Sequence, residues 1–281
     1  MVTNTFPVKE AKPLIEIPKD VPQIGFLGGE AGKEVNDSIR KDYKDFSALQ
    51  VAKYSNEIVI GSNPFYVVAV QSRLPSGVRV SSQADLERAL RTGALNLRGT
   101  YEDTGLVLRS EDNPNEYLSA NLMAQVKERL GKKAKMPVMT PLYGLEIVKD
   151  ESSPQGLAFK LKEDAEIVYA PILNKSGNFD LKDIDEKTGL PKKTEGGNRT
   201  LYTINSGLSR LFLDYNLDVS SDNGNLTYSS DNGRVVLVST AEGGSQDFLN
   251  GKLTELQRTR DAELAKINER YQRAEAVLRG K

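Results

Sequence analysis

The chain of 281 residues contains no cysteine, no histidine and no tryptophan. Without cysteine it has no disulfide framework, no thiolate nucleophile and no thiolate ligand for zinc or an iron–sulfur cluster. Without histidine it lacks the commonest general base at neutral pH and the imidazole that binds zinc, copper or haem. Ser-His-Asp and Cys-His catalysis are therefore excluded. Carboxylate, Lys, Tyr, Ser or Thr chemistry remains, as do oxygen-ligand sites for hard cations.

An excess of charge of one sign is also lacking, because 38 Lys and Arg residues nearly balance 39 Asp and Glu residues. The formal net charge of -1 gives no global field toward nucleic acid or anionic lipid. No stretch is long and apolar enough to span a bilayer, and the N-terminus lacks the apolar core of a signal peptide. We therefore expect a soluble cytoplasmic protein, or part of an intracellular or viral assembly, without membrane insertion.

The order of apolar and turn-forming residues predicts an α+β fold in four parts. Residues 1–22 are expected to form an extended arm, because closely spaced prolines prevent long helices and strands. A mixed α/β lobe over 23–136 and a mainly β lobe over 137–242 follow. The last part is a long amphipathic, coiled-coil-like helix over 243–281. The prolines of the arm are Pro7, Pro13, Pro18 and Pro22.

Capping residues mark the helices of the first lobe. Ser82 is a favourable N-cap, and Gly93 ends the helix that follows it. Asn113-Pro114 precedes a second predicted helix that ends at Gly131. Apolar residues near the 3.6-residue period predict a third helix over 32–53. Predicted strands in this lobe are EIVIG (57–61), FYVVAV (65–70) and TGLVLR (104–109).

The second lobe contains the clearest alternation of the chain. In LFLDYNLDV (211–219) apolar and polar residues alternate strictly, which predicts a strand. Two nine-residue copies follow, SSDNGNLTY (220–228) and SSDNGRVVL (229–237). Each contains Asp-Asn-Gly, the strongest short signal for a hairpin turn. We therefore predict an antiparallel β-meander over 211–239, with turns at Asn223-Gly224 and Asn232-Gly233.

The C-terminal helix is the predicted interaction element. Its apolar residues form a heptad-like stripe that one small core cannot cover, since the helix would be roughly 50 Å long. The stripe predicts pairing with a second copy of the chain or with another helical protein. The residues assigned to this oligomer interface are Leu249, Leu253, Leu256, Leu264, Ile267, Tyr271 and Leu278.

The stretch IGFLGGEAGKE (24–34) resembles part of a phosphate-binding loop but lacks two of its fixed elements. The G-x-x-x-x-G-K-[ST] motif requires Gly where Leu27 stands and Ser or Thr where Glu34 stands. A glycine-rich linker before a helix explains the stretch better. The candidate phosphate-binding residues are Gly28, Gly29, Gly32 and Lys33.

Two clusters of charge are the remaining candidates. Asp180, Asp183 and Asp185 are candidate ligands for a hard cation, but their spacing departs from the EF-hand pattern, so solvated loop acids are the preferred interpretation. A basic run at the end of the 115–131 helix is a candidate nucleic-acid patch, although cations there also complement the helix dipole. The residues of that run are Lys127, Arg129, Lys132, Lys133 and Lys135.

These observations predict a non-enzymatic structural, assembly or interaction protein that is homo-oligomeric through its C-terminal helix. No intact catalytic motif accompanies the missing residue types, and no cofactor is expected. Two alternatives remain open. The first is a protein that binds a phosphate or nucleotide ligand at Gly28–Lys33, and the second is a nucleic-acid-binding protein that uses Lys127–Lys135.

Overall fold

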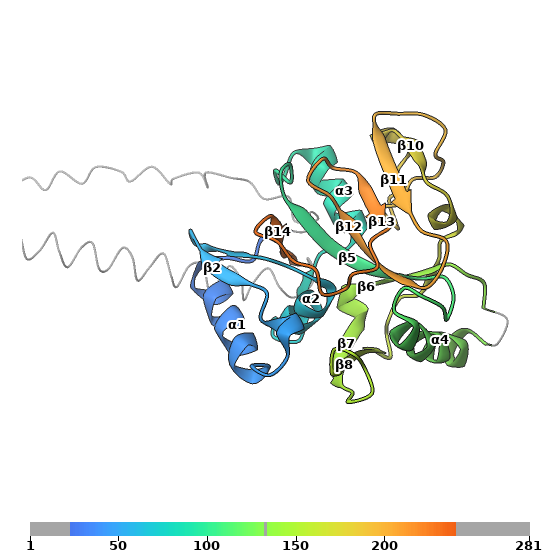
Figure 1. Cartoon of the computed structure of the whole chain (residues 1–281). Coiled ribbons are helices and arrows are strands. Elements are labelled where there is room, and N and C mark those ends of the chain that lie inside the picture. The colour runs from blue at the N-terminus through green and yellow to red at the C-terminus, as the bar shows by residue number, and fades with distance from the viewer. Residues whose placement is uncertain (1–22, 132–133, 240–281) are drawn as a thin grey trace, which may run out of the picture.

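The computed structural model describes residues 23–131 and 134–239. One large curled sheet organises this part of the chain, with helices on both of its sides (Figure 1). The described α-helices are α1 (Gly29–Asp42), α2 (Pro64–Gln71), α3 (Gln83–Thr92) and α4 (Glu116–Leu130). Short 3-10 helices lie at 47–49, 142–144, 171–174 and 181–183. No helix in the described ranges has both the length and the hydropathy that crossing a membrane requires.

The large sheet has eight strands in the order β10-β11-β13-β12-β5-β6-β9, with β14 paired in parallel to β5. Its strands are β5 (Tyr101–Leu108), β6 (Val138–Pro141), β9 (Val168–Tyr169), β10 (Gly177–Phe179), β11 (Arg199–Thr203), β12 (Leu208–Leu213), β13 (Val219–Ser221) and β14 (Gly233–Arg234). A three-stranded sheet has the order β1-β15-β4, from β1 (Gln23–Phe26), β15 (Val236–Ser239) and β4 (Val78–Val80). Two hairpins join β2 (Lys53–Ser55) to β3 (Ile58–Ile60) and β7 (Leu145–Lys149) to β8 (Leu157–Leu161).

Strand β5 is the centre of the fold, and all eight of its residues are buried. Leu106 and Leu108 face an apolar cluster that includes α2, α4 and the β7–β8 hairpin. Val107 faces a second cluster, on the side of α3. Because side chains alternate across a strand, one strand supplies both cores.

The predicted fold, an α+β core with a β-meander and a long C-terminal helix, is wrong. Helix and strand contents of the described residues are nearly equal, at 28% and 29%, and the curled eight-stranded sheet replaces the meander. The predicted 243–281 helix lies outside the described residues, so the described fold has no long C-terminal helix. The division into lobes 23–136 and 137–242 stays a prediction.

The predicted strand over 65–70 is a helix, α2. Asn63 caps it, with its side-chain oxygen accepting a hydrogen bond from the Tyr66 N–H, and Pro64 occupies the first turn. The helix is buried on every side, so it has no polar face that would reveal a helical period. By contrast α3 is confirmed, since Ser82 and Asp85 form a capping box and Gly93 adopts a left-handed conformation. The α4 helix is confirmed as well.

The predicted strand over 211–219 is broken in the middle. Asp214 turns the chain, because its Oδ1 accepts hydrogen bonds from the N–H groups of Asn216 and Asp218, at 2.8 and 2.9 Å. Strands β12 and β13 pair antiparallel across this turn. The polar residues placed on an outer face in the sequence therefore form an Asx turn.

The two Asn-Gly pairs do not form hairpin turns in a meander. A β-carbon on Gly224 would lie 2.5 Å from the Pro114 ring, and one on Gly233 would lie 2.6 Å from the Ser62 nitrogen. The β14 and β15 strands that follow pair with β5 and with β1 and β4. Glycine is required at these two places for close packing between segments distant in sequence.

Candidate ligand-binding site

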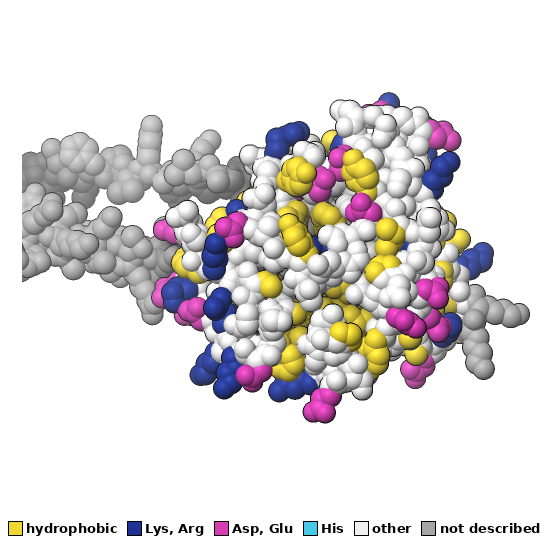
Figure 2. Space-filling model, viewed as in Figure 1, with side chains coloured by type: hydrophobic (Ala, Val, Ile, Leu, Met, Phe, Trp, Pro, Cys, Tyr) yellow, Lys and Arg dark blue, Asp and Glu magenta, His cyan; other side chains and the backbone are white. Residues whose placement is uncertain are grey.

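A cavity of about 290 Å³ lies beside β5 and β12, where the 214–218 turn and the 222–232 segment meet. Its lining contains four aromatic residues and no carboxylate. Figure 2 shows hydrophobic side chains over the region of β5, β12 and β14, whereas Lys and Arg side chains gather over α1. The lining residues are Tyr101, Arg210, Phe212, Tyr215, Asn223, Tyr228, Ser230 and Asn232.

A bulge in β5 positions the residues at the base of this cavity. Gly105 pairs with Leu211 and Asp103 pairs with Phe212, so Thr104 is an extra residue on β5. In a regular strand Asp103 would share a face with Val107, which packs on the α3 side. The bulge reverses that alternation, and Asp103 lies on the opposite side, where its Oδ2 accepts a hydrogen bond from Ser62 Oγ at 3.0 Å.

Arg210 and Asp103 form a buried ion pair beneath the cavity. The Arg210 Nε and Nη2 groups donate to the two Asp103 carboxylate oxygens at 2.6 Å each, and both side chains are at most 1% exposed. Burial raises the pKa of the Asp103 carboxyl, and its two bonds from the guanidinium oppose that rise. The remaining nitrogen, Nη1, donates to the Tyr228 carbonyl at 3.0 Å. The guanidinium is therefore neutralised internally and not free to bind an anion.

The guanidinium also covers two of the aromatic rings. Its carbon lies 5.1 Å from the centre of the Tyr101 ring and 4.9 Å from that of Phe212. The Tyr101 hydroxyl donates to the Ser62 carbonyl at 2.9 Å and accepts from the Ser230 N–H at 3.0 Å. These contacts fix the floor of the cavity and hold the 222–232 segment over β5.

Two tyrosines at the mouth remain available. The Tyr215 and Tyr228 residues are 54% and 48% exposed. Within residues 23–131 and 134–239, their hydroxyls make no hydrogen bond, and neither do the side chains of Ser230 and Asn232. The cavity thus combines exposed aromatic faces with neutral donors and acceptors that have no partner in the described structure.

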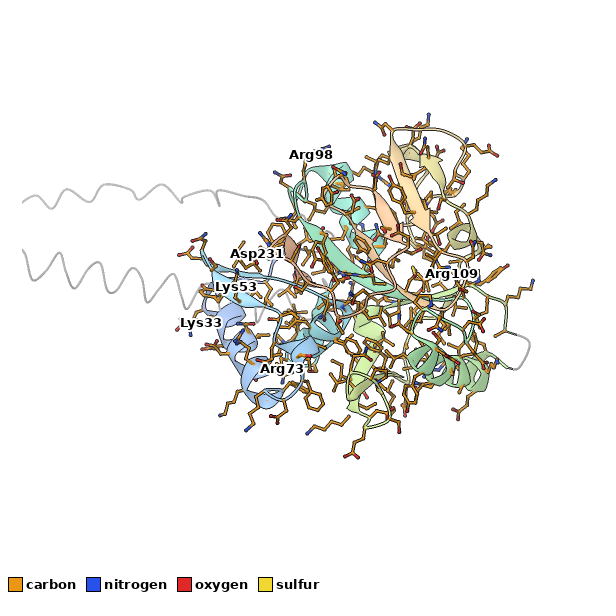
Figure 3. All side chains as sticks on the ribbon, in the orientation of Figure 1. Lys33, Lys53, Arg73, Arg98, Arg109 and Asp231 are labelled. Carbon is orange, nitrogen blue, oxygen red and sulfur yellow. The ribbon has the colours of Figure 1, made fainter. Side chains whose placement is uncertain are left out.

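The charged residues next to the lining of the cavity include two aspartates, Asp222 and Asp231. Asp231 pairs with Lys53 at 2.9 Å, and Figure 3 shows the two residues on the same edge of the molecule. Asp222 is exposed and accepts a hydrogen bond from Ser220 Oγ at 2.5 Å. Arg210 is the one cation among the lining residues of the cavity. Among the lining residues, an anionic ligand would therefore meet no positive charge that lacks a carboxylate partner.

The candidate phosphate loop lies elsewhere, at the start of α1. Gly28 is the helix N-cap and Gly29 has a φ of 63°, while Gly32 is buried against Leu27. Lys33 points to solvent and pairs with Asp37 at 2.7 Å. Among the described residues, no other Lys or Arg side chain donates a hydrogen bond to this loop. Its role in binding phosphate stays a prediction.

The acidic and basic candidates are spread out and engaged. Asp180 and Asp183 lie 3.4 and 4.0 Å from Lys182 and Lys193, and Asp185 accepts from the Thr188 N–H at 2.9 Å. No group of three acidic side chains in the described ranges is placed to hold a metal ion.

In the basic run, Lys127 pairs with Glu111, and Arg129 donates to the Ala165 carbonyl at 3.3 Å. The Lys135 amine lies 5.8 Å from the centre of the Tyr169 ring. Lys132 and Lys133 lie outside the described residues, as do all seven residues of the predicted oligomer interface. The three described cations are therefore engaged within the chain.

The tyrosine cavity is absent from the sites predicted from the sequence. Its residues come from 101 and from 210–232, and nearly all of the second stretch lies within the predicted meander over 211–239. The signal that was present is the pair of tyrosines, Tyr215 and Tyr228, within turn-rich stretches. The chain matches no protein-family model, no curated protein and no solved structure. The function is therefore inferred from the geometry of the cavity alone.

Proposed function

We propose that the chain is a binding protein whose tyrosine cavity takes a neutral, polyhydroxylated ligand of the carbohydrate class. One observation carries the proposal. Two exposed tyrosine faces stand above a floor whose only charge is internally paired, beside hydroxyl and amide groups without a partner in the described residues. A cavity of about 290 Å³ is at the low end of ligand-pocket sizes and suits about one sugar ring at a time.

The chemistry of the lining favours this class of ligand. The face of an aromatic ring is electron-rich, and the C–H groups on one side of a pyranose present weakly positive hydrogens to it. Sugar hydroxyls both donate and accept hydrogen bonds, so they match the Asn232 amide and the Ser230 hydroxyl. The tyrosines supply contact area and the polar groups supply orientation.

Other ligand classes fit less well. A phosphate would have to compete with Asp103 for the Arg210 guanidinium, which already makes two bonds of 2.6 Å. A ligand cation would find the Tyr101 and Phe212 rings of the floor already in contact with the same guanidinium, so its aromatic contacts would be limited to Tyr215 and Tyr228 at the mouth. Hydrolysis of a glycosidic bond ordinarily requires two carboxyl groups about 5–10 Å apart across the bond. The lining contains none, so binding without hydrolysis is the function supported.

Calorimetric titration with cellohexaose, maltohexaose and chitohexaose tests the proposal. We expect one of these probes to bind, and Tyr215→Ala and Tyr228→Ala each to weaken binding about five- to tenfold, the value of one aromatic stacking contact. Tyr202→Ala is the matched control, because Tyr202 is 41% exposed on β11 and does not line the cavity. Equal losses in all three variants, or no binding of any probe to the intact chain, would contradict the proposal.

The three functions expected from the sequence remain separate from this proposal. Homo-oligomerisation through residues 249–278 stays a prediction, since these residues lie outside the described ranges. Phosphate or nucleotide binding at Gly28–Lys33 is supported by a glycine-rich helix N-terminus and opposed by Glu30 in the first turn. Nucleic-acid binding at Lys127–Lys135 gains no support from cations that are engaged within the chain.

A further inference from the structure

The described part of the chain both begins and ends in the three-stranded sheet. Strand β1 begins at Gln23 and β15 ends at Ser239, and these two residues pair directly in the antiparallel register. Residues 1–22 and 240–281 therefore continue from neighbouring points on one sheet.

An apolar groove lies at the same place. It encloses about 150 Å³ and is lined mainly by hydrocarbon from all three strands. Apart from Gly25 and its two chain neighbours, no described residue has a heavy atom within 4 Å of the position that a β-carbon on Gly25 would take. The groove is therefore open toward solvent within the described residues, although a groove of hydrocarbon is stabilised when it is covered. Its lining includes Ile24, Gly25, Phe26, Val78, Leu237 and Ser239.

The segment after β15 has the composition to cover this groove. Gly243-Gly244 permits a change of direction shortly after Ser239, and Leu249, Leu253 and Leu256 follow at spacings of four and three residues. The segment before β1 is shorter and is interrupted by four prolines (Pro7, Pro13, Pro18 and Pro22). The longer segment, with its regularly spaced leucines, is the better occupant.

The short connection favours the same chain over a second copy. Residues 240–248 span at most about 30 Å, enough to return to a groove that begins at Ser239 itself. A connection of this length holds the leucines at an effective concentration on the order of millimolar. A second copy at micromolar concentration competes poorly with a tethered segment of identical sequence.

We propose that Leu249, Leu253 and Leu256 dock in the groove between β1, β15 and β4 of their own chain. This docking does not depend on the proposed carbohydrate binding, because the tyrosine cavity shares no lining residue with the groove. It also assigns three of the leucines predicted for an oligomer interface to a contact within one chain.

Alkylation of a single engineered thiol tests the docking. The chain contains no cysteine, so Gly25→Cys in the full chain places the only thiol in the groove. Tyr202→Cys provides an exposed reference thiol on β11. We expect Gly25→Cys to react with a maleimide about tenfold more slowly than Tyr202→Cys, since reaction would require transient opening of the docked segment.

Full-length variants then identify the occupant. The combined change Leu249→Asp, Leu253→Asp and Leu256→Asp should raise the Gly25→Cys rate close to that of the reference, and leave the Tyr202→Cys rate unchanged. The matched control is Thr254→Asp with Gln257→Asp, which adds charge to the same segment without touching the leucines and should preserve protection. In the double variant Gly25→Cys, Leu253→Cys, mild oxidation should give a monomeric, internally cross-linked chain.

Three results would overturn the proposal. Equal rates for Gly25→Cys and Tyr202→Cys would show that nothing covers the groove. Protection that grows with protein concentration, together with a doubled mass by light scattering, would assign the groove to a second copy. Protection that survives the leucine changes but is lost in Leu14→Asp, Ile15→Asp, Ile17→Asp would assign it to the N-terminal arm.

Discussion

Glu102 is a buried carboxyl group on β5 with one unsatisfied atom. Its Oε1 accepts from Thr100 Oγ1 at 2.5 Å, whereas its Oε2 has no hydrogen-bond partner among the described residues. Burial is the main cause that raises the pKa of Glu102, to about 8. The protonated form of the group is therefore favoured at neutral pH.

This environment makes the stability of the chain depend on pH. A carboxyl whose folded pKa lies above its unfolded value stabilises the fold fully below the unfolded pKa and loses that contribution as pH rises through the folded pKa. We expect the free energy of unfolding to fall between pH 4.5 and about 8, the unfolded and folded values for Glu102. The loss is on the order of 5 kcal/mol, because the two pKa values lie about 3.5 apart and one pKa unit corresponds to about 1.4 kcal/mol.

Glu102→Gln should remove this fall in the free energy of unfolding with pH, and it should stabilise the chain at pH 8, because the amide cannot ionise. Urea denaturation at pH 5, 6.5 and 8 measures the effect. Glu151→Gln is the control, since Glu151 is exposed in the turn between β7 and β8 and should leave the slope in place. An identical slope in the Glu102→Gln variant and the parent chain would show that the dependence has another source.

Helix α2 begins at a buried cap residue, Asn63, that also bonds to segments distant in sequence. The Asn63 side chain is fully buried and makes three hydrogen bonds, accepting from the Tyr66 N–H and donating to the carbonyls of Ala48 and Thr227. It therefore caps the helix and also fastens the 222–232 segment, which lines the tyrosine cavity. Ser82 at α3 makes a capping box but holds no such distant segment.

Asn63→Ala should destabilise the chain by roughly 2–3 kcal/mol, since it leaves two carbonyls and one N–H without their partner. Ser82→Ala should cost about 1 kcal/mol, the usual value for a lost N-cap. Chemical denaturation of both variants at one pH gives the comparison. A smaller loss for Asn63→Ala than for Ser82→Ala would contradict the role assigned to Asn63.

At the scale of the whole molecule, the Asp103–Arg210 pair joins the two central strands of the sheet to the cavity. Asp103→Leu alone should destabilise the chain by about 3–5 kcal/mol, because Arg210 would remain buried without its counter-charge. The double variant Asp103→Leu, Arg210→Met should recover much of that stability, since a well-packed apolar pair replaces a buried ion pair at little net cost.

Denaturation of the two single variants and the double variant gives the coupling energy of the pair. The exposed pair Lys53–Asp231 is the matched control, because its side chains are 57% and 75% exposed and it should contribute less than about 1 kcal/mol. Additive losses for Asp103 and Arg210 would show that the two side chains are not energetically coupled. The double variant should also bind the hexaose probe more weakly, since the floor beneath Phe212 changes shape.

The elements that the sequence predicted correctly are those defined by neighbouring residues. Ser82 and Gly93 bound α3, and the start and end signals of α4 are equally local. The Asn63-Pro64 signal for α2 was also present, but an apolar run of six residues has no period that separates a helix from a buried strand. The same limit applies to 211–219, where alternation concealed an Asx turn at Asp214.

The sequence by itself determined which chemistries are excluded, through its missing cysteine and histidine, and which segments carry strong local caps. Which residues come together to line the cavity was decided by the tertiary structure. Tyr101 and Tyr228 come together because β5 is central and because a bulge at Thr104 turns Asp103 toward Arg210. A bulge and the pairing of strands about a hundred residues apart depend on packing over the whole sheet, which no short stretch of residues specifies.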